Sequence, residues 1–360
     1  MSEDYETRAV WREPVRGSYP PPGGMRLAGL ERLERWLEAG PWPPLSYLTG
    51  AVPTAVGEGE AEARMPASPW LFNSAGVIGG GTLAILADIV FSCAVDTKLP
   101  PATPCTTAEL SLSFLRPPPV DEVLRARGRA IHVGRTVGLS EAFVTAPDGT
   151  LLAHGTSRLA VLPELEGLPE PPELTGEAAS PDDVDDGPWA QRPISGAPIG
   201  QEAWGSRPGG EVLAGQISGE LATPPLHYLT GLTLREAAEG RARMTLPATK
   251  WLTSPTGLLQ GGTLAMLADT TMLSAVTSLA PAGTAVAGLD LKVNYLRPTI
   301  ADGRDLTARA EVAHAGRSLS IARAEIRNAD DKPIALATGS AIFLPGRPAS
   351  LGDRETPPGP

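Results

Sequence analysis

The chain has 360 residues, of which 42% are hydrophobic, and a formal net charge of −11. This length suffices for two ordinary hydrophobic cores, and no apolar run approaches the roughly 18 residues that a membrane span requires. The negative charge is concentrated in residues 164–191, which contain nine acidic residues and no Lys or Arg. Because the rest of the chain is nearly neutral, it lacks the basic face that a nucleic-acid partner would need, and the lack of a long apolar run argues against insertion into a membrane.

Residues 1–24 open with an acidic, polar stretch and are rich in Pro and Gly. They lack the basic and then apolar pattern of a secretory signal, so we expect a cytoplasmic protein with a flexible N-terminal tail over 1–24. A short helix is expected next, over about residues 27–38, because leucines recur there every third or fourth position.

One segment of the sequence occurs twice with a single difference. Pro-Pro-Leu-Ser-Tyr-Leu-Thr-Gly at residues 43–50 returns at 224–231 as Pro-Pro-Leu-His-Tyr-Leu-Thr-Gly, 181 positions later. The same offset carries Gly-Gly-Thr-Leu-Ala at 80–84 onto 261–265. Such a register, kept over more than 70 residues, indicates duplication of one fold unit.

Each copy is expected to contain a strand, near residues 61–65 in the first, followed by an apolar helix that begins at a pair of glycines. That helix is predicted from Gly80 to about Thr97, and in the second copy from Gly261 to about Ser278. Apolar residues surround it on all sides, which is typical of a buried central helix.

Antiparallel strands are expected after the helix. Apolar and polar residues alternate strictly over 109–114, and again over 289–295, which predicts a half-buried strand. Three further strands are predicted in the first copy, over 123–133, 136–145 and 151–162. A long helix followed by an antiparallel meander indicates an α+β fold in which a sheet wraps round a helix.

The duplication predicts a first domain over 25–163 and a second over 213–346. Residues 164–212 are rich in Pro, Gly and acidic residues and are expected to form a linker, and 347–360 a flexible C-terminal tail. Cys93 and Cys105 are the only cysteines, and neither aligned position of the second copy is a Cys. A disulfide framework or a Cys-based metal site is therefore not expected.

A carboxylate inside each apolar helix is the feature hardest to explain by packing. Asp88 lies between Leu-Ala and Ile-Val pairs, and Asp269 recurs at the aligned position. A buried carboxylate is costly unless it has hydrogen-bond partners or a task, so we interpret both as functional. The structural alternative is that each caps a turn or pairs with a buried Arg.

The glycines that begin these helices are the second candidate feature. Gly80 and Gly261 leave backbone N–H groups open at a helix N-terminus, where they can polarise a carbonyl, although such glycines are more often plain turn residues. Gly80 and Asp88 are eight residues apart, or about 12 Å along the axis, too far to act on one carbonyl. If the two helices pack antiparallel about a pseudo-two-fold axis, Asp269 comes near Gly80 and Asp88 near Gly261, giving two composite sites.

The order Asn73, a Gly-Gly-Gly run at 79–81, Asp88, Thr106 and then Phe-Leu-Arg-Pro resembles the PaaI-type hotdog-fold acyl-CoA thioesterases. That family has an Asn, a His-Gly-Gly six residues on, an Asp nine residues after the His and a Ser or Thr downstream. The resemblance covers both copies and implies a tandem double hotdog packed as a pseudo-dimer. It also implies hydrolysis of acyl-CoA thioesters to free acid and coenzyme A, with no metal or organic cofactor beyond the coenzyme A of the substrate.

The chain departs from the family pattern in both copies. The family His is replaced by Gly79 and Gln260, and in the second copy Ser254 stands at the Asn position and Ala287 at the Ser/Thr position. In the family, the helix-start N–H and the Asn polarise the thioester carbonyl, the Asp is base or nucleophile, and the hydroxyl orients water.

Carried across the pseudo-dimer, these roles would divide into two sites. One site would hold Asn73, Gly80 and Asp269, and the other Gln260, Gly261, Asp88 and Thr106. We favour the second, because it keeps a carboxylate, a hydroxyl and an amide together, which suffices to activate water.

Four arginines recur in register and are candidates for the phosphates of coenzyme A, with solvated strand-end charges as an equal alternative: Arg116, Arg135, Arg297 and Arg317. The expected partner is an acyl-CoA, and a homo-oligomer of pseudo-dimers is compatible with the sequence. The eroded motif leaves open a non-catalytic module that binds acyl-CoA or another acyl ligand, and also a structural protein whose tandem domains oligomerise.

Overall fold

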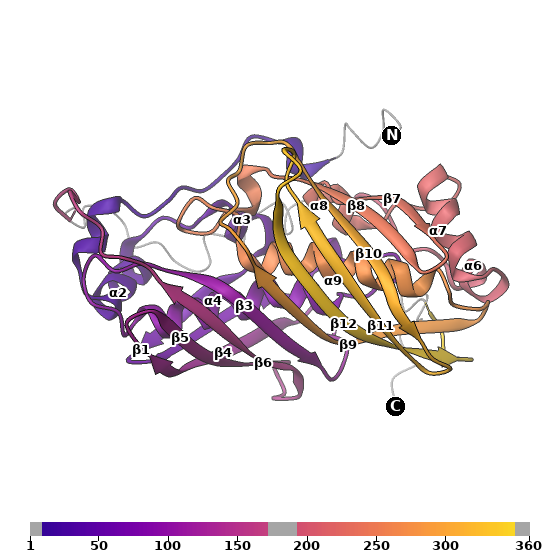
Figure 1. The fold of residues 1–360 in the computed structure, drawn as a ribbon, viewed down its shortest axis with the longest axis horizontal. Helices are drawn as coiled ribbons and strands as arrows, with labels where there is room; N and C mark the ends of the chain where they lie inside the picture. The colour runs from indigo at the N-terminus through magenta and orange to yellow at the C-terminus, as the bar shows by residue number, and fades with distance from the viewer. Residues whose placement is uncertain (1–8, 172–192, 350–360) are drawn as a thin grey trace.

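The computed structural model of the protein describes residues 9–171 and 193–349. Its first half contains the strands β1 (Val52–Gly57), β2 (Glu60–Pro66), β3 (Cys105–Phe114), β4 (Val123–Val133), β5 (Val137–Thr145) and β6 (Leu151–Val161). Its second half contains β7 (Thr233–Ala238), β8 (Arg241–Pro247), β9 (Thr284–Tyr295), β10 (Asp305–Ala315), β11 (Leu319–Arg327) and β12 (Pro333–Pro345). All pair antiparallel in one 12-stranded sheet of order β1-β2-β4-β5-β6-β3-β9-β12-β11-β10-β8-β7 (Figure 1).

Two long helices, α4 (Gly80–Asp96) and α9 (Gly261–Thr277), run along one face of this sheet (Figure 1). The shorter helices are α2 (Gly29–Ala39), α3 (Pro44–Thr49), α6 (Gln201–Ser206), α7 (Gly209–Ser218) and α8 (Pro225–Thr230). None of the helices in the described ranges is long and apolar enough to cross a membrane. The expected α+β fold in two similar halves is confirmed.

The halves join where β3 pairs with β9 at the centre of the sheet. Ser111 lies opposite Lys292, and these residues are equivalent positions of the two copies because they are 181 apart. The pseudo-two-fold axis therefore passes between them. Buried residues of both halves form one continuous hydrophobic cluster, so the halves share a core as well as a sheet.

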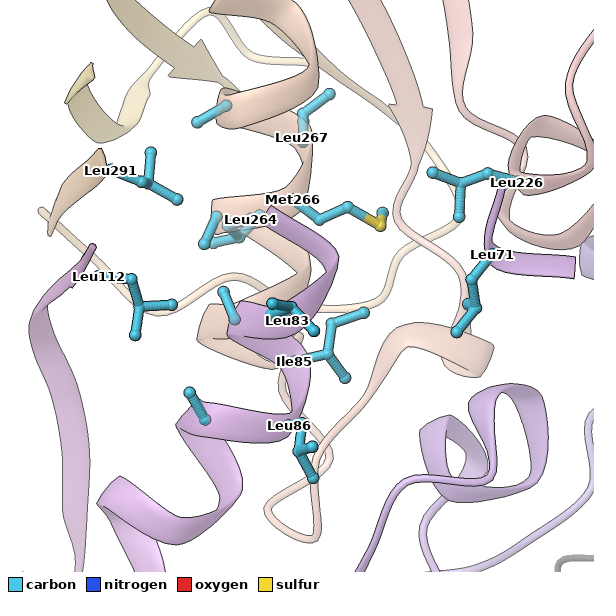
Figure 2. Packing of buried hydrophobic residues seen from close by; sticks show 14 of the residues in the cluster. Leu71, Leu83, Ile85, Leu86, Leu112, Leu226, Leu264, Met266, Leu267 and Leu291 are labelled. Atoms are coloured by element: carbon cyan, nitrogen blue, oxygen red, sulfur yellow. The ribbon is translucent and has the colours of Figure 1, made fainter. Parts of the chain in front are cut away.

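The centre of that core is the contact between α4 and α9. Figure 2 shows Leu83 and Ile85 of α4 beside Leu264 and Met266 of α9, and all four side chains are buried. Burying an apolar side chain of this size contributes roughly 1.5–3 kcal/mol, so the contact is a substantial part of what holds the halves together.

The second glycine of each helix lets the two helix backbones touch. A Cβ on Gly262 would lie 2.5 Å from the carbonyl oxygen of Ala84, and one on Gly81 would lie 3.0 Å from the Cα of Met266. Neither glycine has a positive φ. These glycines are therefore explained by close helix packing rather than by turn geometry.

The predicted central helices end within one residue of the observed ones, and the predicted strands over 123–133, 136–145 and 151–162 match β4, β5 and β6 closely. Strands β1 and β7 and helices α3, α6, α7 and α8 were missed. These elements are short, six to ten residues each, and several lie in Pro- or Gly-containing sequence where periodicity carries little signal.

Part of the expected N-terminal tail is packed, contrary to the expectation of a flexible segment. Val10 is fully buried, the Trp251 indole N–H donates to the carbonyl of Glu13 at 3.2 Å, and the hydroxyls of Tyr19 and Thr253 lie 2.8 Å apart. This segment thus contacts the second half through Glu13 and Tyr19, and the first half through Ser18, whose N–H donates to the carbonyl of Trp42 at 3.0 Å. Helices α6 and α7 likewise occupy the C-terminal end of the expected linker.

The remainder of these segments, residues 1–8, 172–192 and 350–360, lies outside the described residues. They include 21 of the 49 residues of the expected linker and most of the expected C-terminal tail. The domain boundaries at 25–163 and 213–346 stay predictions.

Candidate active site

Each central helix supplies a carboxylate to the N-terminus of the other. The Gly81 N–H donates to Oδ2 of Asp269 at 2.8 Å, and the Gly262 N–H donates to Oδ2 of Asp88 at 3.1 Å. The helices are therefore antiparallel, and each anion lies where the partner helix dipole favours negative charge. The structure thus brings Asp269 to the Gly80 end and Asp88 to the Gly261 end, the juxtaposition that a single helix cannot provide.

Asp88 has a hydroxyl partner. The Thr107 hydroxyl donates to its Oδ1 at 2.8 Å, and the side chain is only 3% exposed. Burial raises the pKa of Asp88, while the bonds from Thr107 and from the backbone of Gly262 and Gly261 act in the opposite direction. The carboxylate is thus held with few degrees of freedom and is easier to protonate than a free one.

The hydroxyl that contacts Asp88 belongs to Thr107, whereas the sequence pattern placed Thr106 there. Strand alternation places Leu110 and Leu112 on the helix side and would place residue 106 there too. A β-bulge interrupts that count, because Thr107 pairs with Leu159 while Glu109 pairs with Arg158, leaving Ala108 unpaired. The extra residue reverses which side chains face the helix and turns Thr107 toward Asp88.

Gln260, at the N-cap of α9, reaches across to the other half. Its Nε2 donates to the carbonyl of Ile85 on α4 at 3.0 Å, whereas its Oε1 is buried without a hydrogen-bond partner among the described residues. A buried acceptor without a hydrogen bond is costly, so this oxygen favours a donor such as water or a substrate group. Gln260 therefore lies at the same helix start, that of α9, as the Asp88 carboxylate.

The Asp269 end lacks the hydroxyl. Gly288 is the position equivalent to Thr107, and Asp269 is 4% exposed. Burial raises the pKa of Asp269 to about 7, with the Gly81 N–H lowering it and the charge of Asp290 raising it. This carboxyl therefore exchanges its proton near neutral pH.

Asn73 lies at the start of α4. Its Oδ1 accepts from the backbone N–H groups of Ala75 and Val77 at 2.9 and 3.3 Å. Its Nδ2 would lie 3.7 Å from a Cβ on Gly79, so the amide nitrogen faces the position of the family His. At the other end the equivalent Ser254 is paired with Thr256 through their hydroxyls at 2.8 Å.

Two aromatic side chains that sequence reasoning missed cover the helix starts. A Cβ on Gly80 would lie 2.5 Å from the ring of Phe114, and the Tyr295 hydroxyl donates to the carbonyl of Gly261 at 2.7 Å. Burial raises the pKa of Tyr295 well above its ordinary value, which keeps the hydroxyl a donor. A signal for these residues was present in the sequence: each alternating strand ends in an aromatic residue, and the two aromatics are 181 positions apart.

The four candidate arginines are all exposed on loops. Arg116 and Arg297 come two residues after the aromatics that cover the helix starts, which places them near the two candidate sites. Arg135 and Arg317 lie in the β4–β5 and β10–β11 turns. Gly138, three residues after Arg135, approaches Val95 near the C-terminal end of α4, so this turn is remote from the helix starts.

Among the described residues, no group of three or more His, Cys, Asp or Glu side chains is arranged to hold a metal ion, and Cys93 and Cys105 are both free. The groups gathered at the two helix starts are carboxylates, amides, hydroxyls and backbone N–H groups.

A family model of the Thioesterase superfamily matches residues 75–153 and again 256–335. The acyl-coenzyme A thioesterase PaaI of Escherichia coli is 33% identical over 116 residues, which cover 32% of this chain and 80% of PaaI. The chain belongs to the thioesterase superfamily. Each of the two matched ranges contains one central helix with its aspartate.

Two further comparisons bear on the length and the fold of this superfamily member. A "Putative esterase" of Caenorhabditis elegans is 33% identical over 97 residues, which cover 27% of this chain and only 57% of that protein. The crystal structure of the tesB protein of Mycobacterium avium subsp. paratuberculosis aligns with a TM-score of 0.52 at 17% identity, covering 84% of this chain and 98% of that one. The expected double hotdog, with a superfamily match in each half, is confirmed.

Proposed function

We propose that the protein hydrolyses acyl-CoA thioesters to free carboxylic acid and coenzyme A at composite sites between its halves, with Asp88 and Asp269 as base or nucleophile. The observation that carries the proposal is that the buried aspartate of each central helix accepts a hydrogen bond from the N-terminus of the other central helix. A carboxylate and a partly positive helix end then face one small region, as hydrolysis of a carbonyl compound requires. The name of the relative PaaI supplies the substrate class.

The proposed reaction begins with a water molecule held by the Asp88 carboxylate. Gln260 Oε1, which has no other partner among the described residues, accepts one hydrogen of this water, and Asp88 removes the other as oxygen attacks the thioester carbon. As Asp88 takes this proton it becomes a weaker acceptor, and the Gly261 N–H that pointed to it stabilises the oxyanion instead. The C–S bond then breaks, and the proton on Asp88 passes to the departing thiolate of coenzyme A.

Thr107 fixes the orientation of the Asp88 carboxylate in this scheme through its 2.8 Å bond. In the other site Asp269 takes the same role, with Asn73 as the amide donor toward the carbonyl. A pKa of about 7 suits Asp269 as a base, because it is basic enough to accept a proton and still largely ionised just above neutral pH.

Arg116 and Arg297 are the stronger candidates for the phosphates of coenzyme A, since each follows a strand that ends at a helix start. We further infer an acyl-CoA as the only partner needed for activity, a cytoplasmic location, and an assembly that can include several pseudo-dimers.

Release of free thiol from a panel of acyl-CoAs tests the proposal. The double variant Asp88→Asn/Asp269→Asn preserves side-chain volume and should lower turnover by about 10²-fold or more, the usual scale for losing a general base. Circular dichroism of the double variant checks that it is folded. Unchanged thiol release in this variant would remove the aspartates from the mechanism, and binding of acyl-CoA without any release by the wild type would favour the non-catalytic acyl-binding module.

A further inference from the structure

The residue that follows Asn73 is held by two residues from far along the chain. The Ile199 N–H donates to the Ser74 carbonyl at 2.9 Å, and the Ser74 hydroxyl donates to Oε1 of Gln216, on α7, at 2.7 Å. Ile199 and Gln216 are both buried, so water competes little for these bonds. The two bonds fix the backbone and the side chain of the residue beside the Asn73 amide.

The residue that precedes Asn73 is held as well. The Leu226 N–H, at the start of α8, donates to the Phe72 carbonyl at 3.2 Å. Within the loop, Oδ1 of Asn73 accepts from backbone N–H groups, so its amide nitrogen is the end left to face Gly79. Asn73 thus lies between two anchored neighbours with its own amide oriented, as a preorganised hydrogen-bond donor requires.

Helices α2 and α7 are equivalent elements of the two copies. The first residue of α2 donates its N–H to the Leu99 carbonyl, and the first residue of α7 donates its N–H to the Ala280 carbonyl, each at 2.9 Å. Leu99 and Ala280 are 181 positions apart, so the two helices begin at the same place in the fold. Counted from these starts, the residue of α2 that corresponds to Gln216 is Trp36.

Both partners of the hydroxyl–amide contact differ at the other helix start. Pro255 stands in place of Ser74 and has no hydroxyl, and the Trp36 indole N–H donates to the Pro41 carbonyl within its own half at 2.8 Å. The Asn is also absent at that end, where Ser254 stands. The contact is therefore present only where the chain keeps the Asn, which ties it to that amide.

The segment that brings Ile199 to this loop is itself duplicated. Pro-Val-Arg-Gly-Ser at residues 14–18 corresponds to Pro-Ile-Ser-Gly-Ala at 193–197, and the glycine of each has a positive φ and packs on an equivalent tyrosine, Tyr47 or Tyr228. Each segment then crosses to the loop before the central helix of the other copy. This crossing is part of the repeated unit, and it lies outside the two ranges that the superfamily model matches.

We propose that Gln216 is a positioning residue of the Asp269 site, which holds Ser74 together with Ile199 so that the Asn73 amide is aimed at the thioester carbonyl before substrate binds. The inference rests on the proposed thioesterase function, in which that amide is a donor to the carbonyl. Without the acceptor on α7, the Ser74 side chain is released and the neighbouring amide loses part of its orientation. Small displacements of this kind are costly, since about 1 Å can lower a rate by about 10²-fold.

Kinetics of Gln216 variants in an Asp88→Asn background isolate the Asp269 site, with the best acyl-CoA of the panel as substrate. Gln216→Met removes the acceptor with little change of volume and should lower kcat about 10-fold at unchanged KM. Gln216→Glu keeps an acceptor for the Ser74 hydroxyl and should restore most of this loss. Asn73→Ala should lower kcat by about 10²-fold, and adding Gln216→Met should lower it no further, because Gln216 acts through that amide.

Four outcomes would overturn the assignment. Three are an unchanged kcat in Gln216→Met, a Gln216→Glu variant as slow as Gln216→Met, and multiplication of the two losses in the variant that combines Gln216→Met with Asn73→Ala. The fourth is no thiol release from Asp88→Asn while the wild type is active, because the Asp269 end would then do no catalysis. Ser74→Ala removes the same bond from the other side and serves if Gln216→Met does not fold.

If the wild type releases no thiol from any acyl-CoA, the proposed function has failed, and the positioning is measured without turnover. Hydrogen exchange is then followed at Ala75 and Val77, whose N–H groups donate to Asn73. Exchange should be faster in Gln216→Met than in the wild type or in Gln216→Glu. Equal exchange in all three proteins would show that Gln216 does not position the loop.

Discussion

The two ends of the helix pair carry the same carboxylate contact in different surroundings. At one end Asp88 has the Thr107 hydroxyl, and the Gln260 oxygen at the start of the partner helix has no hydrogen-bond partner among the described residues. At the other end Gly288 stands in place of the threonine, and Asp269 lines a small cavity together with Asp290 and Ser340. The hydroxyl and the unpaired amide oxygen thus lie at one end and the cavity at the other.

The comparison teaches what duplication permits. In a dimer of identical chains, every substitution appears in both sites, so a residue that helps one and harms the other has no net advantage. In a tandem chain the positions are independent. Thr107 and Gly288, or Leu159 and Ala341, are pairs that a symmetric dimer could not contain.

The largest effects are expected from removing each carboxylate alone. Asp88→Asn should lower thiol release by about 10²-fold or more, and Asp269→Asn, at the end that lacks the hydroxyl, should lower it less. Thiol release measured for each variant across the acyl-CoA panel gives the result. Equal, severe losses in both variants would mean that both ends work and that the hydroxyl does not distinguish them.

The next effect concerns the helix contact on which both ends depend. Gly262→Ala places a methyl group 2.5 Å from a backbone oxygen of α4, so we expect a loss of roughly 1–3 kcal/mol in unfolding free energy. Gly57→Ala is the matched control, because nothing lies within 4 Å of its added Cβ. Urea unfolding of both variants checks this, and equal stability of the two would show that the glycine is not needed for packing.

A smaller effect on turnover should distinguish Thr107 from its neighbour Thr106. Thr107→Val should lower turnover at the Asp88 end about 10-fold, the order expected for losing a hydrogen bond to a charged group. Because that bond lowers the pKa of Asp88, its loss should also move the pH–rate midpoint for acetyl-CoA upward. Thr106→Val is the control and should do neither. A larger effect of the control would restore Thr106 as the functional hydroxyl.

The last effect is on the pH dependence of stability and leaves activity aside. The pKa of Asp269 rises from 3.8 to about 7 on folding, so between about pH 4 and 7 the folded protein keeps a proton that the unfolded chain has lost. Stability from this group is complete below pH 4 and is lost as pH rises to 7. The melting temperature of Asp269→Asn minus that of the wild type should therefore be larger at pH 8 than at pH 5. An identical difference at both pH values would contradict the raised pKa.

Sequence reasoning reached the duplication, the two central helices and the pairing of Asp88 and Asp269 with opposite helix starts, because these follow from local pattern and from the length of one helix. It placed the hydroxyl at Thr106, since the bulge at Ala108 appears only when β3 is paired with β6. The cavity beside Asp269 was also missed. Its lining comes from α9 and from strands β9, β11 and β12, which are distant in sequence and are brought together only by the fold.

The seam between β3 and β9 lies within a single polypeptide, and this bears on how the protein responds to dilution. Two separate chains with such a seam would dissociate as their concentration falls, and composite sites would be lost with them. A tether of a few tens of residues instead holds the halves at an effective concentration in the millimolar range. Activity per molecule should then be the same at nanomolar and micromolar protein, with no lag on dilution.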